Sequence, residues 1–215
     1  NLLRYIMNFF QRVEWRLYKE FKRSKLENTT PTIISSNCNG EFWYYDMKLK
    51  FFSPTINLSF DMNDYVKMLE NLQWYMEQPI LPHEDNRFEY PTGMLGDIEI
   101  RFNHYKSFEE AVAKWEERKK RINWDNLFVL GIDGDDCTYE SMQRFDRLPY
   151  KNKVIFTHIP YPEIKSAYYI PGFESEEGVG VLIYFKNQFL VRRYLDDFDY
   201  VAFLNGKGIK RKGKL

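Results

Sequence analysis

Apolar residues recur every three or four positions near the start of the chain. Over residues 2–23 they are Leu3, Ile6, Phe10, Val13, Leu17 and Phe21, and basic residues fill the other face. This spacing predicts an amphipathic helix. Such a helix could lie on an anionic membrane surface. Because Glu14 and Glu20 interrupt the basic face, we expect the helix to dock on the protein's own core instead.

Shorter patterns predict strands and helices along the rest of the chain. Ile98, Ile100 and Phe102 alternate with polar residues, which indicates a strand with one buried face. Ser107 precedes an apolar helical pattern, and Glu110 completes a capping box. Further strands are expected at 32–36, 127–132, 153–156, 179–185 and 200–204, an aromatic hairpin at 42–52, and helices at 63–76 and near 139–145.

Strands alternate with helices through the middle of the chain, which is typical of an α/β fold. We therefore predict a mixed, largely parallel sheet covered by helices. The expected organisation is an N-terminal amphipathic helix over residues 1–26, packed on the domain, a single α/β domain over 27–205, and a basic C-terminal tail over 206–215.

Charge is balanced overall but uneven along the chain. The 215 residues include 31 basic and 31 acidic side chains, so no nucleic-acid partner is expected. Residues 1–25 carry seven basic and two acidic side chains, and the last eleven carry five basic ones. Residues 26–204 carry 19 basic and 29 acidic side chains. Basic termini on an acidic central region suggest either a tail that binds the surface of another molecule or contacts between the termini and the central region.

The two cysteines bear on the cellular compartment of the protein. Cys38 and Cys137 lie far apart and have no zinc-type spacing, so they read as thiols of a reducing compartment. No apolar run approaches the roughly 20 residues of a transmembrane helix, and no signal peptide is visible. We therefore expect a cytoplasmic protein without a transmembrane segment.

Chemistry-bearing residues follow four of the predicted strands. Open α/β sheets bind ligands beyond the carboxyl ends of their strands. Residues 35–39, which include Asn37 and Cys38, follow the first strand, and His104 and Tyr105 follow another. His158 follows a third. We expect Cys38, His104 and His158 as catalytic candidates, with His104 as the general base, because imidazole titrates near neutral pH. A thiol that is only packed at a strand end remains the alternative for Cys38.

The fourth set of residues suggests a metal ion. Asp133-Gly134-Asp135 follows an apolar strand, and two carboxylates at this spacing would suit Mg²⁺ or Mn²⁺ on a nucleotide-sugar diphosphate. A simple turn that caps the next helix is the alternative. A basic stripe that would meet phosphates is formed by Lys114, Arg118 and Arg121. The substrate-binding candidates are therefore Asn37, Tyr105, Lys114 and Arg118. A solvated helix face is the alternative for the stripe.

Several blocks of sequence resemble a known group of proteins. They are Ser36-Asn37-Cys38, Phe52-Ser53-Pro54-Thr55, Tyr90-Pro91-Thr92-Gly93, residues 97–105, residues 114–124, Phe145-Asp146, residues 148–153 and Phe156-Thr157-His158. Through them the chain, from about residue 31 to 205, resembles a bacterial family of unknown function whose members are often labelled exopolysaccharide biosynthesis proteins. The resemblance implies a role in surface polysaccharide synthesis and carries over no catalytic residues.

These observations lead to two hypotheses of different kinds. The first is a transferase acting on a sugar or nucleotide-sugar intermediate, with a nucleotide-sugar or sugar phosphate as its ligand. The second is a non-catalytic module that binds a sugar or a protein partner. A hydrolase that depends on Cys38 is a further alternative.

Overall fold

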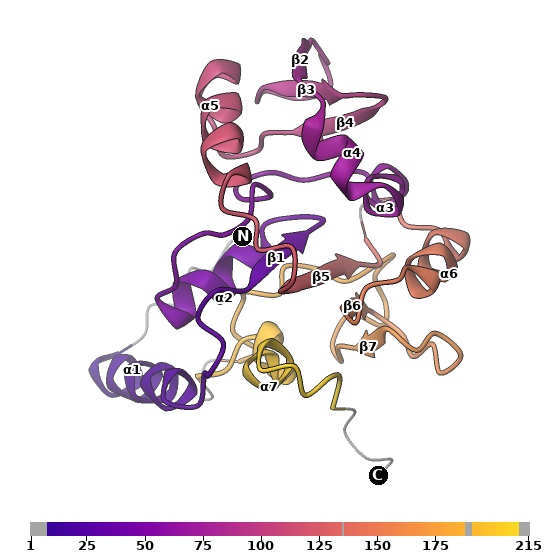
Figure 1. Cartoon of the computed structure of the whole chain (residues 1–215). Helices are drawn as coiled ribbons and strands as arrows, with labels where there is room; N and C mark the ends of the chain where they lie inside the picture. The colour runs from indigo at the N-terminus through magenta and orange to yellow at the C-terminus, as the bar shows by residue number, and fades with distance from the viewer. Residues whose placement is uncertain (1–7, 135, 188–190, 211–215) are drawn as a thin grey trace.

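The computed structural model describes residues 8–134, 136–187 and 191–210 (Figure 1). Its centre is a four-stranded, fully parallel sheet. The strands are β1 (Thr32–Ser35), β5 (Leu127–Ile132), β6 (Asn152–Thr157) and β7 (Ala167–Tyr169), in the spatial order β1-β5-β6-β7. Their residues are mostly buried, as expected of parallel strands covered on both faces.

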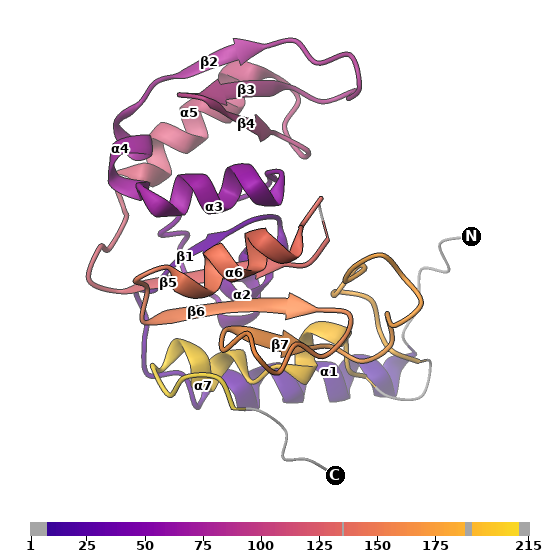
Figure 2. The same cartoon turned by 90° about the vertical axis from the view of Figure 1, so that its right-hand side faces the viewer.

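Helices cover both faces of this sheet (Figure 2). One face is covered by α3 (Met62–Glu70) and α6 (Tyr139–Arg147), and the other by α2 (Asn39–Met47) and α7 (Tyr200–Leu204). Alternate residues of β5 enter separate cores: Val129 packs on the side of α3, and Phe128 and Leu130 pack on the side of α2. The fold is therefore layered, with one apolar cluster on each side of the sheet.

A smaller antiparallel sheet stacks beyond α3. It consists of β2 (Ile80–His83), β3 (Thr92–Leu95) and β4 (Ile98–Arg101), and it is accompanied by α4 (Leu72–Glu77) and α5 (Phe108–Lys119). Figure 2 shows this sheet and α5 at the far side of α3 from the parallel sheet. Both sheets contribute to one apolar cluster, so the chain forms a single mixed α/β unit.

The predicted fold class and several elements are confirmed. The mixed α/β architecture, its largely parallel sheet and the N-terminal helix are all present. Ser107 caps α5 by accepting a hydrogen bond from the Glu110 amide at 3.2 Å. Strands predicted at 127–132 and 153–156 correspond to β5 and β6, and the alternating run at 97–102 corresponds to β4.

Four predicted elements differ from the structure. The aromatic stretch at 42–52 begins in α2 instead of a hairpin, because a helix buries Trp43, Tyr44 and Met47 together. This helix ends at Lys48, whose φ of 54° is left-handed. Residues 200–204 form α7, and residues 179–185 form a loop with one bridge, between Phe185 and Arg193. The helix predicted at 63–76 is divided at Asn71 into α3 and α4.

The N-terminal helix contacts the domain with an unexpected face. Helix α1 (Phe9–Arg23) follows an Asn8 cap, and residues 1–7 lie outside the described part of the chain. We expected its apolar stripe to pack on the core, but Phe10, Val13, Leu17 and Phe21 are exposed. Trp15 and Tyr18 face the domain instead, where arginine side chains lie over their rings. None of the helices in the described ranges is long and apolar enough to cross a membrane.

Candidate active site

The carboxyl ends of β5 and β6 bring two of the predicted site residues together. Asp133 follows β5 and His158 follows β6, and these strands are direct neighbours in the sheet. Because both strands are parallel, the two residues emerge at the same edge, about 4.8 Å apart in strand spacing. Their proximity thus follows from strand order, which the sequence does not contain.

The Asp133 carboxylate holds His158 in one orientation. Its Oδ2 lies 2.6 Å from His158 Nδ1 and accepts a hydrogen bond from the His158 backbone amide at 2.8 Å. The Asp133 side chain is 2% exposed and the His158 side chain 15% exposed. A carboxylate in this position favours the tautomer with the proton on Nδ1 and leaves Nε2 as the proton acceptor. The pair therefore has the arrangement of a histidine base and its orienting acid.

A loop from later in the chain completes the Asp133 environment. The Val179 amide donates to Asp133 Oδ1 at 2.8 Å. At the preceding position, a Cβ on Gly178 would lie 2.8 Å from Gly134 Cα and 2.9 Å from the Asp133 carbonyl oxygen. Only glycine permits this approach of two backbones. Figure 2 shows the segment after β7 folding across the end of the sheet toward which the strands point.

The residues after β1 lie one strand further along the same edge. Cys38 occupies the position before α2 without a side-chain capping bond, and its Sγ donates to the Leu58 carbonyl at 3.8 Å. Asn37 Oδ1 accepts from the Asn39 amide at 3.0 Å. Among the described residues, two buried hydroxyls at this edge, Ser36 Oγ and Thr157 Oγ1, have no hydrogen-bond partner. The edge from β1 to β6 therefore contains a thiol, an amide and the Asp133–His158 pair, with two fully buried hydroxyls beneath them.

His104 does not belong to this edge of the parallel sheet. It follows β4 of the antiparallel sheet, is exposed, and donates its backbone amide to the Asn57 carbonyl at 3.4 Å. Glu41 lies in its electrostatic neighbourhood. Burial raises the pKa of the Glu41 carboxyl, while the Asn57 amide at 2.9 Å, His104 and Arg118 act in the opposite direction. His104 is thus beside a group of titratable side chains that includes Glu41 and Arg118.

Two of the substrate-binding candidates, Tyr105 and Arg118, are buried and hydrogen-bonded to each other. Tyr105 is buried, and its hydroxyl donates to the Ile56 carbonyl at 3.0 Å and accepts from Arg118 Nη1 at 2.6 Å. The Arg118 guanidinium also lies 5.2 Å from the centre of the Phe51 ring. Lys114, in contrast, is exposed and pairs with Glu117 at 3.3 Å. The predicted basic stripe is therefore divided between an inward arginine and an outward lysine.

The carboxylates of the predicted metal site are only partly described. Asp135 lies outside the described residues. Asp133 already accepts three hydrogen bonds, so its geometry fits the orientation of His158 better than the chelation of an ion. His83, Asp85 and Glu99 also gather within 4.8 Å on the antiparallel sheet. Arg87 hydrogen-bonds Asp85 and lowers its pKa, and Arg101 contacts Glu99 at 3.0 Å, so arginines already neutralise this second cluster.

Sequence reasoning missed the contribution of the Gly178-Val179 segment. The sequence shows only that Gly178-Val179-Gly180 lacks the pattern of a dinucleotide or phosphate loop. The Val179 group that contacts Asp133 is a backbone amide, which carries no residue-type signal. The only available sign was a glycine at a position where backbones approach closely.

Comparison with known proteins identifies relatives across nearly the whole chain. A protein of Haemophilus influenzae strain Rd, described as "Uncharacterized protein", is 42% identical over 206 residues, which cover 93% of this chain and 99% of that protein. The model of the domain of unknown function DUF1919 matches residues 8–205, a range that contains both sheets and the Asp133–His158 pair. The chain belongs to the DUF1919 family.

Proposed function

We propose that this protein is a transferase that acts on a sugar or nucleotide-sugar intermediate of bacterial surface polysaccharide, with His158 as its general base. The observation that carries the proposal is the hydrogen-bonded Asp133–His158 pair at the carboxyl ends of adjacent parallel strands. Ligands of open α/β sheets bind at this edge. The resemblance to proteins labelled for exopolysaccharide biosynthesis supports the choice of substrate class.

In the proposed reaction, His158 Nε2 removes the proton from an acceptor hydroxyl as the hydroxyl oxygen attacks the anomeric carbon of the nucleotide-sugar donor. The bond from this carbon to the nucleoside diphosphate breaks, and the nucleoside diphosphate leaves with the electron pair. Asp133 stabilises the resulting imidazolium through the 2.6 Å contact with Nδ1. We expected His104 in this role. His158 is favoured because its Nδ1 faces a buried carboxylate, whereas His104 is exposed and follows a strand of the other sheet. Asn37 and Cys38, at the neighbouring strand end, remain substrate-binding and catalytic candidates.

The proposed location is the cytoplasm. Cys38 and Cys137 form no disulfide with each other, which is compatible with a reducing compartment. A divalent ion at Asp135, such as Mg²⁺ or Mn²⁺, remains part of the proposal for a nucleotide-sugar diphosphate donor, because hard carboxylate oxygens suit these ions.

The test begins with ligand-dependent thermal stability. Nucleotide-sugars, sugar phosphates and free nucleotides are each added with and without Mg²⁺ or Mn²⁺. A ligand at 100 times its dissociation constant stabilises the fold by about 2.7 kcal/mol, which raises the melting temperature measurably. We expect a shift with one nucleotide-sugar or sugar phosphate. No shift with any member of the panel contradicts the proposal and favours the non-catalytic module.

Variants of the three histidines then identify the base. With the ligand from the panel, His158→Asn should retain the thermal shift but reduce transfer by about 10²- to 10⁴-fold, the usual contribution of a general base. His83→Asn, on the antiparallel sheet, is the matched control and should leave transfer unchanged. Loss of transfer in His104→Asn together with full transfer in His158→Asn would contradict the assignment.

A further inference from the structure

Helix α1 displays an unbroken apolar stripe to solvent. Phe10, Val13, Leu17 and Phe21 recur at helical spacing, and their exposed fractions range from 42% to 81%. Phe9, beside them, is 73% exposed. A helix on a globular domain normally buries this stripe. Exposure of several large apolar side chains in one row marks a surface that binds something apolar.

The opposite face of α1 is fixed to the domain, so the stripe cannot turn inward without breaking specific contacts. Trp15 packs edge-on against Phe185 at 5.4 Å, and the Arg193 guanidinium lies 4.7 Å from the Trp15 ring. The Arg192 guanidinium lies 3.7 Å from the Tyr18 ring. Lys22 Nζ is 2.9 Å from Asp196 Oδ1 and 3.9 Å from the centre of the Tyr200 ring. These cation–π and ionic contacts set the direction of the stripe.

The acidic residues of α1 are neutralised by neighbouring cations. Glu14 pairs with Arg192 at 3.4 Å, and Glu20 pairs with Arg23 at 2.6 Å and with Lys48 at 3.3 Å. Glu14 and Glu20 therefore do not oppose contact with an anionic surface, contrary to the expectation from the sequence. The helix keeps a net positive field beside its apolar stripe.

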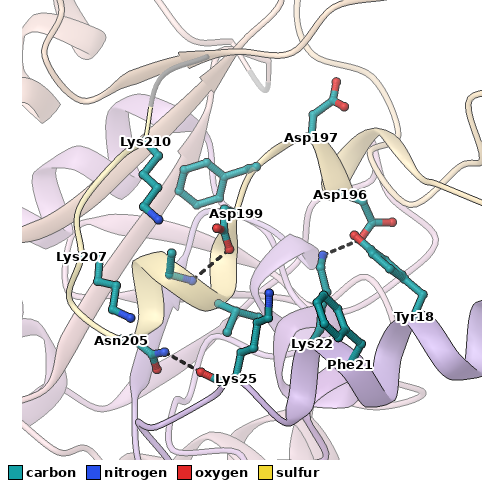
Figure 3. A pocket seen from close by; sticks show the side chains of 13 residues that line it. Tyr18, Phe21, Lys22, Lys25, Asp196, Asp197, Asp199, Asn205, Lys207 and Lys210 are labelled. Carbon is teal, nitrogen blue, oxygen red and sulfur yellow. Dashed lines mark hydrogen bonds and ion pairs between the residues drawn. The ribbon is translucent and has the colours of Figure 1, made fainter. Parts of the chain in front are cut away.

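A lysine-lined pocket adjoins the stripe (Figure 3). It has a volume of about 410 Å³ and lies between α1 and the segment around α7. Lys25, Lys207 and Lys210 point into it from these two segments, and Phe21 belongs both to the pocket and to the stripe. Apolar insertion and cationic contact would therefore occur on one continuous surface.

The acidic side chains that line this pocket have partners in the protein. Asp196 pairs with Lys22 and Arg193, and Asp199 caps α7 by accepting from the Ala202 amide at 3.0 Å. Asp197 hydrogen-bonds Lys186. Lys207 itself lies 3.7 Å from Glu27 in an ion pair whose side chains are 53% and 75% exposed, so this pair is open to solvent. The pocket consequently presents the ammonium groups of Lys25 and Lys210, with Lys207 beside them, toward an incoming anion. Arg211, Lys212 and Lys214 follow in the sequence and lie outside the described residues.

We propose that α1 and the adjoining lysines dock this protein on the surface of an anionic lipid bilayer. The stripe enters the boundary between headgroups and acyl chains, and Lys25, Lys207 and Lys210 contact lipid phosphates. Exposed Phe and Leu side chains beside basic residues are the combination that interfacial helices use. A polar protein partner would not need the apolar row, and an uncharged apolar partner would not need the lysines. This proposal is independent of the reaction assigned to His158.

The test is flotation of the full chain with vesicles at low salt. One vesicle population is pure phosphatidylcholine, and the other contains about 30% phosphatidylglycerol, which supplies the negative surface potential. We expect binding to the anionic vesicles, with weaker binding at high salt and little binding to phosphatidylcholine. No binding to the anionic vesicles overturns the proposal. A solution dimer that Leu17→Glu dissociates, without vesicle binding by the wild type, also overturns it.

Matched variants separate the stripe from general surface effects. Leu17 and Leu81 are both exposed, at 64% and 59%, so neither substitution to Glu should unfold the chain. We expect Leu17→Glu to weaken vesicle partitioning by about ten-fold or more and Leu81→Glu to leave it unchanged. Equal partitioning of the two variants overturns the proposal. Thermal unfolding of both variants checks that each retains the fold.

The lysines have their own control. A triple variant with Lys25→Gln, Lys207→Gln and Lys210→Gln should lose about five-fold in partitioning per lysine at low salt. The control replaces Lys106, Lys120 and Lys151, which are exposed elsewhere on the domain, and has the same net charge. Equal loss in both triple variants would mean that net charge alone drives binding, which contradicts a defined docking surface.

Discussion

Arg193 lies in a buried network of charges that joins three separate segments of the chain. Its guanidinium hydrogen-bonds Asp46 of α2, and its Nε contacts Asp196 Oδ2 at 3.1 Å. Asp46 also accepts from the Tyr200 hydroxyl at 3.0 Å, and Asp196 pairs with Lys22 of α1. The side chain of Arg193 is 7% exposed. We predict that Arg193→Ala destabilises the fold far more than Arg192→Ala, although the two residues are adjacent in sequence.

The magnitudes follow from burial. Arg193→Ala leaves the carboxylates of Asp46 and Asp196 buried with one cation fewer, and removing one partner of a buried pair costs about 3–5 kcal/mol. Arg192 pairs with Glu14 at 3.4 Å, where the two side chains are 39% and 52% exposed. An exposed ion pair contributes about 1 kcal/mol or less. The contact of Arg192 with Tyr18 adds about 0.5–1 kcal/mol. The expected difference between the variants is therefore about 1–4.5 kcal/mol, with a central value of about 3 kcal/mol.

Urea unfolding followed by circular dichroism measures this difference. The midpoint should fall much further in Arg193→Ala than in Arg192→Ala, with similar dependence of the unfolding free energy on urea concentration. Equal losses in the two variants would refute the reasoning that burial decides the value of each arginine.

The pH dependence supplies a second readout for the same variant. Burial alone would raise the pKa of Asp196, but Arg193 and Lys22 lower it below the ordinary value. A lowered carboxyl pKa contributes stability above the unfolded value of about 3.9, and this contribution is lost as pH falls through the folded value. Arg193→Ala removes part of this contribution. Its stability deficit should therefore be larger near neutral pH than in strong acid, and a constant deficit would contradict the assignment.

Three further substitutions test particular contacts. Burial raises the pKa of Glu41, so its ionised form disfavours folding at neutral pH. Glu41→Gln should therefore raise the melting temperature at neutral pH and have little effect near pH 4. An equal effect at both pH values would contradict this cause. Gly178→Ala places a Cβ 2.8 Å from Gly134 Cα, so it should lower the free energy of unfolding by about 1–3 kcal/mol in thermal unfolding and loosen Asp133. Unchanged stability would mean that the two backbones separate freely. Tyr65→Phe removes a fully buried hydroxyl that lies 2.8 and 3.0 Å from main-chain carbonyls of β1 and β5. The free energy of unfolding in urea should fall by about 1 kcal/mol. A stabilised variant would contradict the value given to these bonds.

The sequence predicts the central strands well because their signals are strong and local. Residues 127–132 and 153–156 are short apolar runs between turn-forming segments, as parallel strands require. Strands β2 and β3 carry Pro82 and Gly93, two residue types that are unfavourable in strands, so their pairing could not be read from composition. The aromatic residues of α2 favour strands by propensity, and only burial against the sheet makes them helical.

The candidate site could be predicted in its residues but not in its geometry. Asp133 and His158 both follow apolar runs, so their positions at strand ends are visible in the sequence. Their contact depends on β5 and β6 being neighbours, which is a property of the assembled sheet. His104 gave the same local signal as His158, and its strand belongs to another sheet. Local pattern therefore identified the strand ends without distinguishing which of them meet.

The position of α1 also has a consequence for the order of events during protein synthesis. Lys22 reaches Asp196, which is 174 residues further along the chain. A ribosome that adds about 5–20 residues per second needs roughly 10–35 s to make that partner. During this interval the aromatic face of α1 has no docking partner from residues 192–200. Helix α1 therefore completes its docking only after residues 192–200 have been made.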